Sequence, residues 1–325
     1  MKIAVISAVY NEGANIERFM QSLLGQTRIP DEIILVDDGS TDSTPMLIEQ
    51  QAIQQPRIKL IRQANQGPAS ARNQGWRAVA SDICLFTDGD CVPEINWVEK
   101  IEQILLRHPD AGGAAGTYTT LNQHSSLARV IGLEIAWRYR HKPETIDAHG
   151  AYNLAIRKNL LESVGGFNEK YPVPSGEDWD LTYKISAQAP IYFEPEAIVG
   201  HFHPDRLGWY LKNQERRAFD RIRVYRDHPA KKSGDAYTGS SDMLQILFAG
   251  LVMADFLLSF LSPAFVPFLL ISAFVLLLLP LSRILFIYKQ TDVQTAGNAA
   301  FFFFLRSFAW CIGATRGILR FGFPF

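Results

Sequence analysis

A triplet of two acids around a glycine, Asp88-Gly89-Asp90, follows the apolar segment ICLFT at residues 83–87. Two carboxylates separated by one small residue, on a loop at a strand end, can approach one divalent cation. Mg²⁺ and Mn²⁺ prefer such oxygen ligands and usually keep substrate phosphates in their coordination shell. Because Asp and Gly are also common in solvated turns, the triplet by itself predicts either a cation site or an ordinary turn.

Two more polar clusters follow apolar segments in the same way. Residues 10–12 (YNE) come after the β-branched segment 3–9, and residues 37–40 (DDGS) come after the segment 32–36. The second cluster is typical of a turn and helix cap, but Asp38 can also accept a hydrogen bond from a nucleotide base or a ribose hydroxyl. Ligands of open α/β sheets bind beyond the carboxyl ends of the strands. Three acidic clusters at such ends therefore predict one shared site.

The segments that carry these clusters alternate between strand-like and helical patterns over the first 90 residues. This alternation predicts an α/β fold with a mixed, mostly parallel sheet between helices. Helices are expected at residues 15–24, 43–52 and 69–80. Strands are expected at residues 3–9, 32–36, 57–62 and 83–87, and then at 111–118, 151–156 and 191–193 in a less regular second half.

Another pair of acids, Glu177 and Asp178, lies in the segment GEDWD at residues 176–180, where a helical pattern begins. Acids at a helix start are favoured by the helix dipole and often need no further reason. The alternative is catalysis, in which one carboxylate removes the proton of a hydroxyl group as that hydroxyl attacks. These residues alone leave both explanations open.

The overall charge and the cysteines exclude several classes of protein. A net charge of −1 provides no field that would attract nucleic acid. Cys84, Cys91 and Cys311 form neither a disulfide framework nor a metal-ligand spacing, so we expect packing residues in a reducing compartment. The N-terminus runs from Met1 and Lys2 directly into a strand-like segment, without the features of a signal peptide. We therefore expect the catalytic part in the cytoplasm.

The composition changes near residue 240, which predicts a soluble domain at residues 1–240 and a membrane domain at residues 241–325. Basic residues flank the apolar part on both sides, and this places both flanks on the cytoplasmic side of an inner membrane that the chain crosses more than once. The basic segment 206–232 suits anionic headgroups. The apolar elements expected are a helical hairpin of residues 243–262 and 264–282, and an interfacial or third segment at residues 299–325.

The chain carries, in this order, the motifs AVYNEGANI, ILVDDGSTDST, GPASARNQGWRAV, FTDGDCVP, GGFNE and GEDWDL. Together they resemble the inverting family-2 glycosyltransferases of the GT-A fold, over roughly residues 3 to 218. The resemblance implies transfer of a sugar from a nucleotide-sugar donor, with a UDP-sugar as the expected donor and Mg²⁺ or Mn²⁺ as the cofactor. A lipid-linked or glycan acceptor at the membrane is expected, as in the synthesis of cell-envelope polysaccharides.

The same resemblance implies roles for individual positions. Asp178 matches the general base, and Glu177 is its acidic neighbour. His203 competes with His201 as a metal ligand, and a structural role remains open for either histidine. The positions implied for the cation are Asp90, Asp88 and His201, and those implied for the donor are Ala8, Tyr10, Glu12, Asp38, Arg72, Asp88 and Gly89.

The segment QERRA at residues 214–218 resembles the Gln-x-x-Arg-Trp motif of membrane-embedded polysaccharide synthases. It has Ala218 where that motif has an aromatic residue that caps an acceptor glycan, which puts processive synthesis in doubt. The aromatic and basic residues 137–141 either contribute to the acceptor side or form an ordinary helix face. The positions implied for the acceptor side are Gln214, Arg217 and Trp179.

Three alternatives to single sugar addition remain. A small processive polysaccharide synthase would produce a ladder of polymers. A non-catalytic membrane scaffold that retains the fold has no need for Asp88, Asp90 and Asp178 together. A dinucleotide-dependent dehydrogenase would carry a G-x-G-x-x-G turn after its first strand, where this chain has YNEGAN.

Overall fold

The computed structural model describes residues 1–140, 142–171 and 173–323. The chain forms two compact units. The first, here called the sheet unit, comprises Met1–Leu121 and Lys142–Phe202, and the second, the helical unit, comprises Asn122–His141 and His203–Phe325. These units are defined by how the chain packs. The predicted boundary at residue 240 separates a soluble part from a membrane part, and it stays a prediction.

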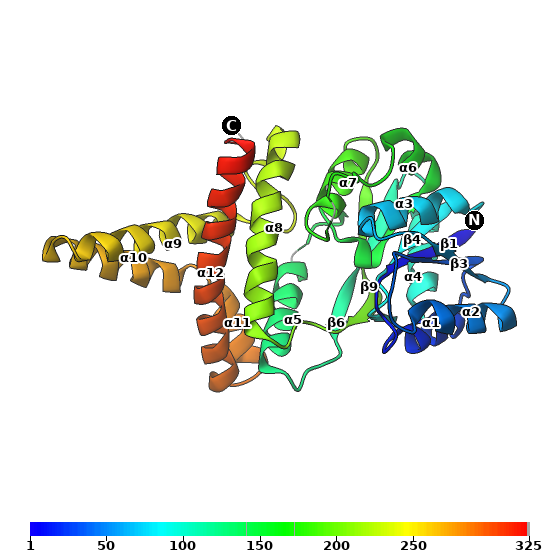
Figure 1. The fold of residues 1–325 in the computed structure, drawn as a ribbon, viewed down its shortest axis with the longest axis horizontal. Helices are drawn as coiled ribbons and strands as arrows, with labels where there is room; N and C mark the ends of the chain where they lie inside the picture. Colours follow the sequence, from blue (N-terminus) through cyan, green and yellow to red (C-terminus); the bar gives the residue numbers. More distant parts are fainter. Residues whose placement is uncertain (141, 172, 324–325) are drawn as a thin grey trace. The chain divides into compact units, whose positions relative to one another are not determined.

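A mixed nine-stranded sheet forms the centre of the sheet unit (Figure 1). Its strand order is β3-β2-β1-β4-β8-β6-β9-β5, with β7 paired to β9. The first four strands along this path run parallel, and β8 is antiparallel to both β4 and β6. The strands are β1 Ile3–Val9, β2 Glu32–Asp37, β3 Ile58–Arg62, β4 Ile83–Phe86, β5 Cys91–Pro93, β6 Gly113–Thr120, β7 Thr145–Ile146, β8 Leu154–Arg157 and β9 Ile191–His201.

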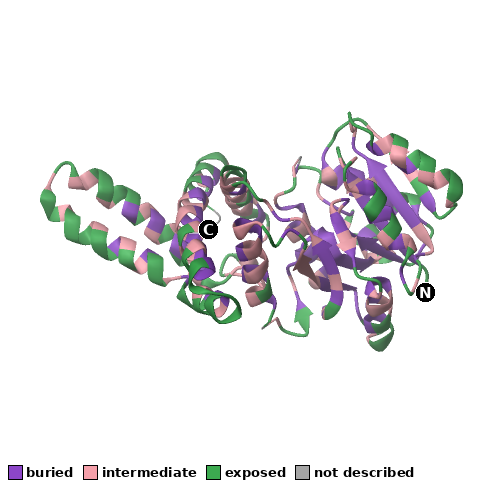
Figure 2. Ribbon diagram, turned by 90° about the horizontal axis from the view of Figure 1, so that it is seen from below, coloured by how far each residue is buried: buried purple, intermediate pink, exposed green. Residues whose placement is uncertain are grey.

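Helices flank this sheet, which confirms the predicted fold class. Strand β1 is apolar on both faces and almost fully buried, because helices cover the sheet from both sides. Figure 2 shows much of the sheet as buried. The helices of the unit are α1 Ile16–Leu24, α2 Thr44–Gln54, α3 Pro68–Ala78, α4 Trp97–Arg107, α6 Lys158–Val164 and α7 Glu177–Ser186, with a 3₁₀ turn at Ala151–Asn153.

Two strand predictions were wrong in extent. The strand expected at residues 151–156 begins only at Leu154, because a 3₁₀ turn occupies residues 151–153. The strand expected at residues 191–193 continues to His201, because β9 pairs along its length with β6 and, at its end, with β5. This longer strand is what brings His201 to the edge where the acidic loops lie.

The helical unit consists of long helices that pack mainly on one another. Helices α9 and α10 run side by side (Figure 1), and their outward faces are largely exposed (Figure 2). The 29-residue α12 packs along α8. The helices are α5 Ser126–Tyr139, α8 Leu207–Asp227, α9 Ser240–Ser259, α10 Val266–Leu278, α11 Leu281–Gln290 and α12 Val293–Phe321.

By length and composition, α9 and α12 could each cross a membrane, and α10 with α11 would make a third such element if the bent pair is one span. The expected apolar segment 264–282 is not a single helix, since α10 ends at Leu278 and the axis bends by 46° before α11. Pro280 at this break lacks a backbone N–H and so favours the interruption. Of the expected segment 299–325, residues 324 and 325 lie outside the described residues.

Five charged residues from four helices form a buried cluster inside the helical unit, here called the acid–arginine cluster. Glu134 of α5 pairs with Arg138 at 2.8 Å, with Arg283 of α11 at 3.3 Å and with Arg306 of α12. Asp242 of α9 pairs with Arg138 at 2.9 Å and with Arg283 at 2.7 Å. Burial alone would raise the pKa of Glu134, but the surrounding guanidinium groups lower it to about 2. Glu134 is therefore ionised at neutral pH, and its ion pairs hold α5 against α11 and α12.

Candidate active site

The loops after β1 and β2 are hydrogen-bonded to one another at the carboxyl edge of the sheet. The Asn11 N–H donates to Ser40 Oγ, and the Glu12 N–H donates to Thr44 Oγ1, both at 2.8 Å. Ala8 is half-buried at the end of β1, and the Tyr10 side chain beside it is 49% exposed. This edge therefore offers an accessible aromatic ring above a fixed pair of loops.

Asp38 is buried and holds the loop that leads into α3. Its Oδ1 accepts from the Gln63 side chain at 2.6 Å and from the Gln66 N–H at 2.8 Å, and its Oδ2 accepts from the Gly67 N–H at 2.8 Å. Gly67 has a φ of 91°, a conformation that glycine adopts readily. Asp38 thus stabilises this loop. Its Oδ2 can accept a further hydrogen bond, and the expected contact with a nucleotide base or ribose stays a prediction.

Arg72 of α3 lies among three carboxylates that come from two distant segments of the sequence. Its Nη2 donates to Asp88 Oδ1 at 2.9 Å, and its Nη1 donates to Glu177 Oε1 at 2.9 Å and lies 3.4 Å from Asp178 Oδ1. Burial opposes the charge of this guanidinium, but the three carboxylates outweigh burial and raise the pKa of Arg72. The resemblance placed Arg72 in a nucleotide pocket; the structure shows that it ties the loop after β4 to the start of α7.

Glu177 and Asp178 differ in the hydrogen bonds that their carboxylates accept and in their exposure to solvent. Glu177 is buried, and its Oε2 accepts from the Ser175 N–H at 2.9 Å and from the Gly176 N–H at 3.1 Å while Oε1 binds Arg72. The Asp178 side chain remains 19% exposed. Burial and the Glu177 carboxylate raise the pKa of Asp178 to about 7, against the opposing charge of Arg72. Asp178 can therefore take a proton near neutral pH.

The triplet around Gly89 divides between two sets of partners. Asp88 binds Arg72, whereas the Asp90 carboxylate faces His201, with Oδ2 3.6 Å from Nε2. A side chain at position 89 would lie 2.8 Å from Val9 Cγ1, so glycine allows this loop to lie against the end of β1. Asp88 and Asp90 were both expected to hold the cation, and the structure brings only Asp90 to the histidine.

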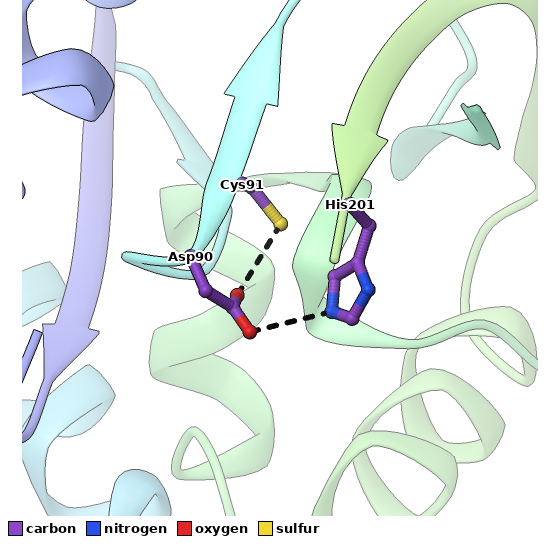
Figure 3. Close-up of side chains that lie close together, drawn as sticks. All are labelled: Asp90, Cys91 and His201. Atoms are coloured by element: carbon purple, nitrogen blue, oxygen red, sulfur yellow. Dashed lines mark hydrogen bonds and ion pairs between the residues drawn. The ribbon is translucent and has the colours of Figure 1, made fainter. Parts of the chain in front are cut away.

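Asp90, Cys91 and His201 form the candidate metal cluster (Figure 3). Their ligand atoms all lie within 4.8 Å of one another, and Cys91 Sγ is 3.7 Å from Asp90 Oδ1. The expectation that Cys91 is only a packing residue missed this placement. His203 is not part of the cluster: its backbone N–H and C=O both bond Asn122 in the helical unit.

Glu12 is a further acid near this cluster. Burial raises the pKa of Glu12 to about 7, and the Asp90 and Asp88 carboxylates contribute to the shift although a hydrogen bond from Asn15 opposes it. Burial also raises the pKa of Asp90, which His201 partly offsets. A cation would relieve the mutual repulsion of these acids.

The residues implied for the acceptor side are separated between the two units. Trp179 is half-buried on α7 of the sheet unit, next to Asp178. In the helical unit, Gln214 accepts a hydrogen bond from Trp310 Nε1 at 2.8 Å, and Arg217 is exposed. Their acceptor role stays a prediction.

The aromatic and basic residues 137–141 have partners within the helical unit. Arg138 belongs to the acid–arginine cluster, Trp137 lies beneath the Arg283 guanidinium at 5.0 Å, and Arg140 lies over the Phe286 ring at 5.2 Å. His141 lies outside the described residues. These contacts favour the ordinary helix face over the acceptor role.

Sequence comparisons identify a family model that matches about the first half of the chain, and relatives that match more than two thirds of it. Residues 4–159 match the family model described as Glycosyl transferase family 2. Pre-mycofactocin glycosyltransferase of Mycobacterium tuberculosis is 26% identical over 260 residues, which are 76% of this chain and 52% of that relative. Glycosyltransferase AglE of Haloferax volcanii is 27% identical over 243 residues, which are 69% of this chain and 74% of that relative. The chain thus spans about half the length of the first of these proteins.

A solved structure resembles the chain over nearly its full length. Mannosyltransferase PcManGT from Pyrobaculum calidifontis, in complex with GDP-Man and Mn²⁺, aligns with 98% of this chain and 88% of its own chain. The TM-score is 0.61 and the sequence identity is 18%. At this identity the likeness shows a shared fold.

Proposed function

We propose that this chain, whose residues 4–159 belong to glycosyl transferase family 2 and which has the GT-A fold, is a membrane-attached inverting glycosyltransferase. It would move a sugar from a nucleotide-sugar donor, with UDP-sugars the first candidates, to an acceptor hydroxyl at the membrane. The observation that carries the proposal is the convergence of Asp88, Asp178 and Arg72 beside the Asp90–His201 pair at one edge of the sheet.

The donor set at this edge fits a divalent cation. A carboxylate oxygen of Asp90 and an imidazole nitrogen of His201 are both ligands for Mn²⁺, and they lie 3.6 Å apart. When bound, such a cation would offset the negative charge that develops on the departing nucleoside diphosphate. Tyr10 offers an exposed aromatic face for the nucleotide base, and Asp38 holds the loop that leads into α3.

Asp178 is the proposed general base. It would accept the proton of the acceptor hydroxyl as the hydroxyl oxygen attacks the anomeric carbon on the face opposite the leaving diphosphate, which inverts the anomeric configuration. Glu177 and Arg72 hold Asp178 in place, because Arg72 contacts both acids at once. The proton goes to the Asp178 carboxylate, and the bonding pair of the broken glycosidic C–O bond leaves with the diphosphate.

Single addition is favoured over processive synthesis by the surroundings of Ala218. This residue stands where the processive synthases have an aromatic side chain, and α12 packs closely against it. A Cβ atom built at Gly313 of α12 would lie 3.0 Å from the Ala218 Cβ and 2.0 Å from the Glu215 carbonyl oxygen. Because the two helices touch here, an aromatic side chain at position 218 would have to push α12 away.

The test of the proposed activity uses the full chain in purified membranes. A panel of nucleotide sugars is incubated with and without Mn²⁺, and the released nucleoside diphosphate is measured. We expect release with one class of donor, dependent on the cation, and a product extended by one sugar. A ladder of polymers would establish the processive alternative, and no release with any donor would support the non-catalytic scaffold.

The C-terminal helices are proposed to hold the enzyme at the cytoplasmic face of the inner membrane. The hairpin of α9 and α10 presents exposed apolar side chains, including Phe260 and Leu261 at its turn, which are 74% and 81% exposed. Every backbone N–H in the turn from residue 260 to residue 265 has an acceptor within the hairpin, which allows the turn to enter an apolar medium. Lys231 and Lys232 before it and Lys289 after it would face the cytoplasm.

Helix α12 is proposed to lie at the membrane surface rather than to cross it, although its length and composition would allow a span. It is bound along α8 by the Gln214–Trp310 hydrogen bond and by an ion pair between Glu215 and Arg316. A spanning α12 would carry α8 into the bilayer, where each charged side chain costs at least about 2.5 kcal/mol. The charged residues of α8 are Lys212, Glu215, Arg216, Arg217, Asp220, Arg221, Arg223, Arg226 and Asp227.

Charging the turn of the hairpin should release the protein from membranes. We expect the double variant Phe260→Arg, Leu261→Arg to move from the membrane pellet to the soluble fraction after an alkaline wash, because two guanidinium groups would have to enter the apolar layer. The matched control is Met46→Arg, Ile53→Arg, which changes two exposed apolar residues of α2 in the sheet unit. If the turn variant stays in the pellet as firmly as this control, the hairpin is not the anchor.

A further inference from the structure

We propose that Cys91 is a third protein ligand at the Asp90–His201 site, and that its sulfur makes the site prefer transition-metal ions over Mg²⁺. The inference rests on the proposed function for the use of the cation, but the binding itself can be measured without any transfer reaction. Asp90 and His201 were candidates from the sequence, whereas Cys91 enters through the fold alone. Cys91 is buried in the core of the sheet unit, and its thiol lies within reach of both other ligands.

The sheet register places Cys91 opposite His201. Strand β5 pairs antiparallel with β9, and Cys91 is the direct partner of His201 in this ladder. Directly opposite residues of an antiparallel pair project from the same face of the sheet, with their Cβ atoms about 4.5–5.5 Å apart. The thiol and the imidazole therefore point into the same space, where Figure 3 shows them on either side of the Asp90 carboxylate.

The spacing of the three groups suits one small ion. Asp90 Oδ1 lies 3.7 Å from Cys91 Sγ, and Asp90 Oδ2 lies 3.6 Å from His201 Nε2. In a tetrahedral zinc site with Zn–S of about 2.3 Å and Zn–N or Zn–O of about 2.1 Å, neighbouring ligand atoms are roughly 3.3–3.6 Å apart. One ligand atom from each of the three side chains lies within 4.8 Å of the other two, so a local adjustment of the side chains would let one ion contact all three.

The ligand types decide which ion. Mg²⁺ demands an octahedral shell of oxygens and gives up water reluctantly, so a sulfur and a nitrogen ligand offer it little. A thiolate, an imidazole and a carboxylate together suit zinc and cobalt, and affinities rise from Mn²⁺ through Co²⁺ towards the end of the first transition series. We therefore expect the site to discriminate strongly against Mg²⁺ and to leave the outer coordination positions for diphosphate oxygens.

A second buried thiol in the same sheet provides a matched control. Cys84 on β4 is as fully buried as Cys91 and is also a free thiol. Among the described residues, the cluster of potential metal ligands includes Cys91 but not Cys84. A serine at either position changes one buried thiol to a hydroxyl, so general effects of that change are shared by both variants.

The experiment is a Co²⁺ titration of the full-length protein in detergent, followed by absorption spectroscopy. We expect a near-ultraviolet charge-transfer band from thiolate to cobalt, saturating at one ion per chain, in the wild type and in Cys84→Ser. Cys91→Ser should bind Co²⁺ without this band, and its affinity for Zn²⁺ should fall at least about tenfold. Replacing a residue that only hydrogen-bonds to a metal ligand already lowers metal affinity by about tenfold or more. Its affinity for Mg²⁺ should change by less than about twofold, because sulfur contributes little to Mg²⁺ binding.

Two outcomes would overturn the inference. One is saturable Co²⁺ binding to the wild type without a thiolate band, which does not depend on how any variant folds. The other is a Cys91→Ser protein, folded by circular dichroism, whose ratio of Zn²⁺ to Mg²⁺ affinity equals that of Cys84→Ser. Failure of the proposed function would look different, since the band would appear in a protein that releases no nucleotide from any donor. Asp90→Ala should lose Co²⁺ binding altogether, which ties the band to this cluster.

Discussion

Asp178→Asn is expected to lower kcat by about a hundredfold to ten-thousandfold, which is the contribution that a general base normally makes. The affinity for donor and cation should stay within about twofold of the wild type. The amide cannot accept the hydroxyl proton, but it keeps the shape of the carboxylate and a hydrogen-bond acceptor towards Arg72 Nη1, 3.4 Å away in the wild type. Single-turnover transfer gives the chemical step, and titration of nucleoside diphosphate with Mn²⁺ gives binding.

The matched control is Asp180→Asn, two residues further along the same helix. Asp180 pairs with Lys184 of the same helix at 2.5 Å. We expect this variant to transfer sugar at close to the wild-type rate. A wild-type rate in Asp178→Asn would remove Asp178 as the base, and an equal loss in both variants would indicate damage to α7 rather than to catalysis.

The pH profile of the wild type gives an independent check on the same residue. Because burial and Glu177 raise the pKa of Asp178 to about 7, the carboxyl group is protonated below this pH and cannot accept a proton. The rate of transfer should therefore fall as the pH drops below about 7, approaching tenfold for each pH unit. Asp178→Asn should lack this acidic limb.

Arg72→Met is expected to lower the free energy of unfolding by about 3–5 kcal/mol at neutral pH, the usual consequence of leaving buried charges without their partner. The methionine fills part of the arginine volume but leaves Glu177, which is buried, and Asp88 without the guanidinium that binds them at 2.9 Å.

The midpoint of thermal unfolding in one detergent measures this effect. Arg72→Lys should fall between wild type and Arg72→Met, since an ammonium keeps the charge but cannot bind two carboxylates with a planar fork. Arg77→Met is the matched control on the same helix, where the side chain is 51% exposed and lies 3.8 Å from Glu169. Exposed pairs of this kind contribute about 0–1 kcal/mol. Equal midpoints for Arg72→Met and Arg77→Met would contradict the proposed role of the buried arginine.

The acidic loops could be predicted because the strands before them have a strong local pattern. Residues 3–9, 33–36 and 83–86 are almost entirely apolar and bounded by polar residues, so both the strands and the loops beyond them follow from local composition. The identity of the cation partners could not follow in this way. Strand β5 is three residues long and exists only because it pairs with β9, about 110 residues later, so neither Cys91 nor its proximity to His201 has a signal in the nearby sequence.

The extent of β9 shows the same limit. Its middle, Glu194 to Glu196 with a proline between them, breaks the apolar pattern, and the sequence therefore predicted a strand of only three residues. Pairing with β6 carries the strand past this interruption, with an irregularity in the register between residues 115 and 117. Arg72 was singled out from a motif, but its contact with Glu177 joins residues 105 positions apart and depends on the fold.

The acid–arginine cluster bears on how the protein can be shortened for expression. A chain cut at residue 240, where the sequence turns apolar, would lose Asp242, Arg283 and Arg306 and keep Glu134 and Arg138. These two would then meet solvent on a helix whose other contacts have also gone, since α5 packs on α11 and α12. A fragment made in this way would expose to solvent the face of α5 that packs on α11 and α12 in the full chain. Replacing residues on that face with polar ones is the first requirement for keeping the fragment in solution.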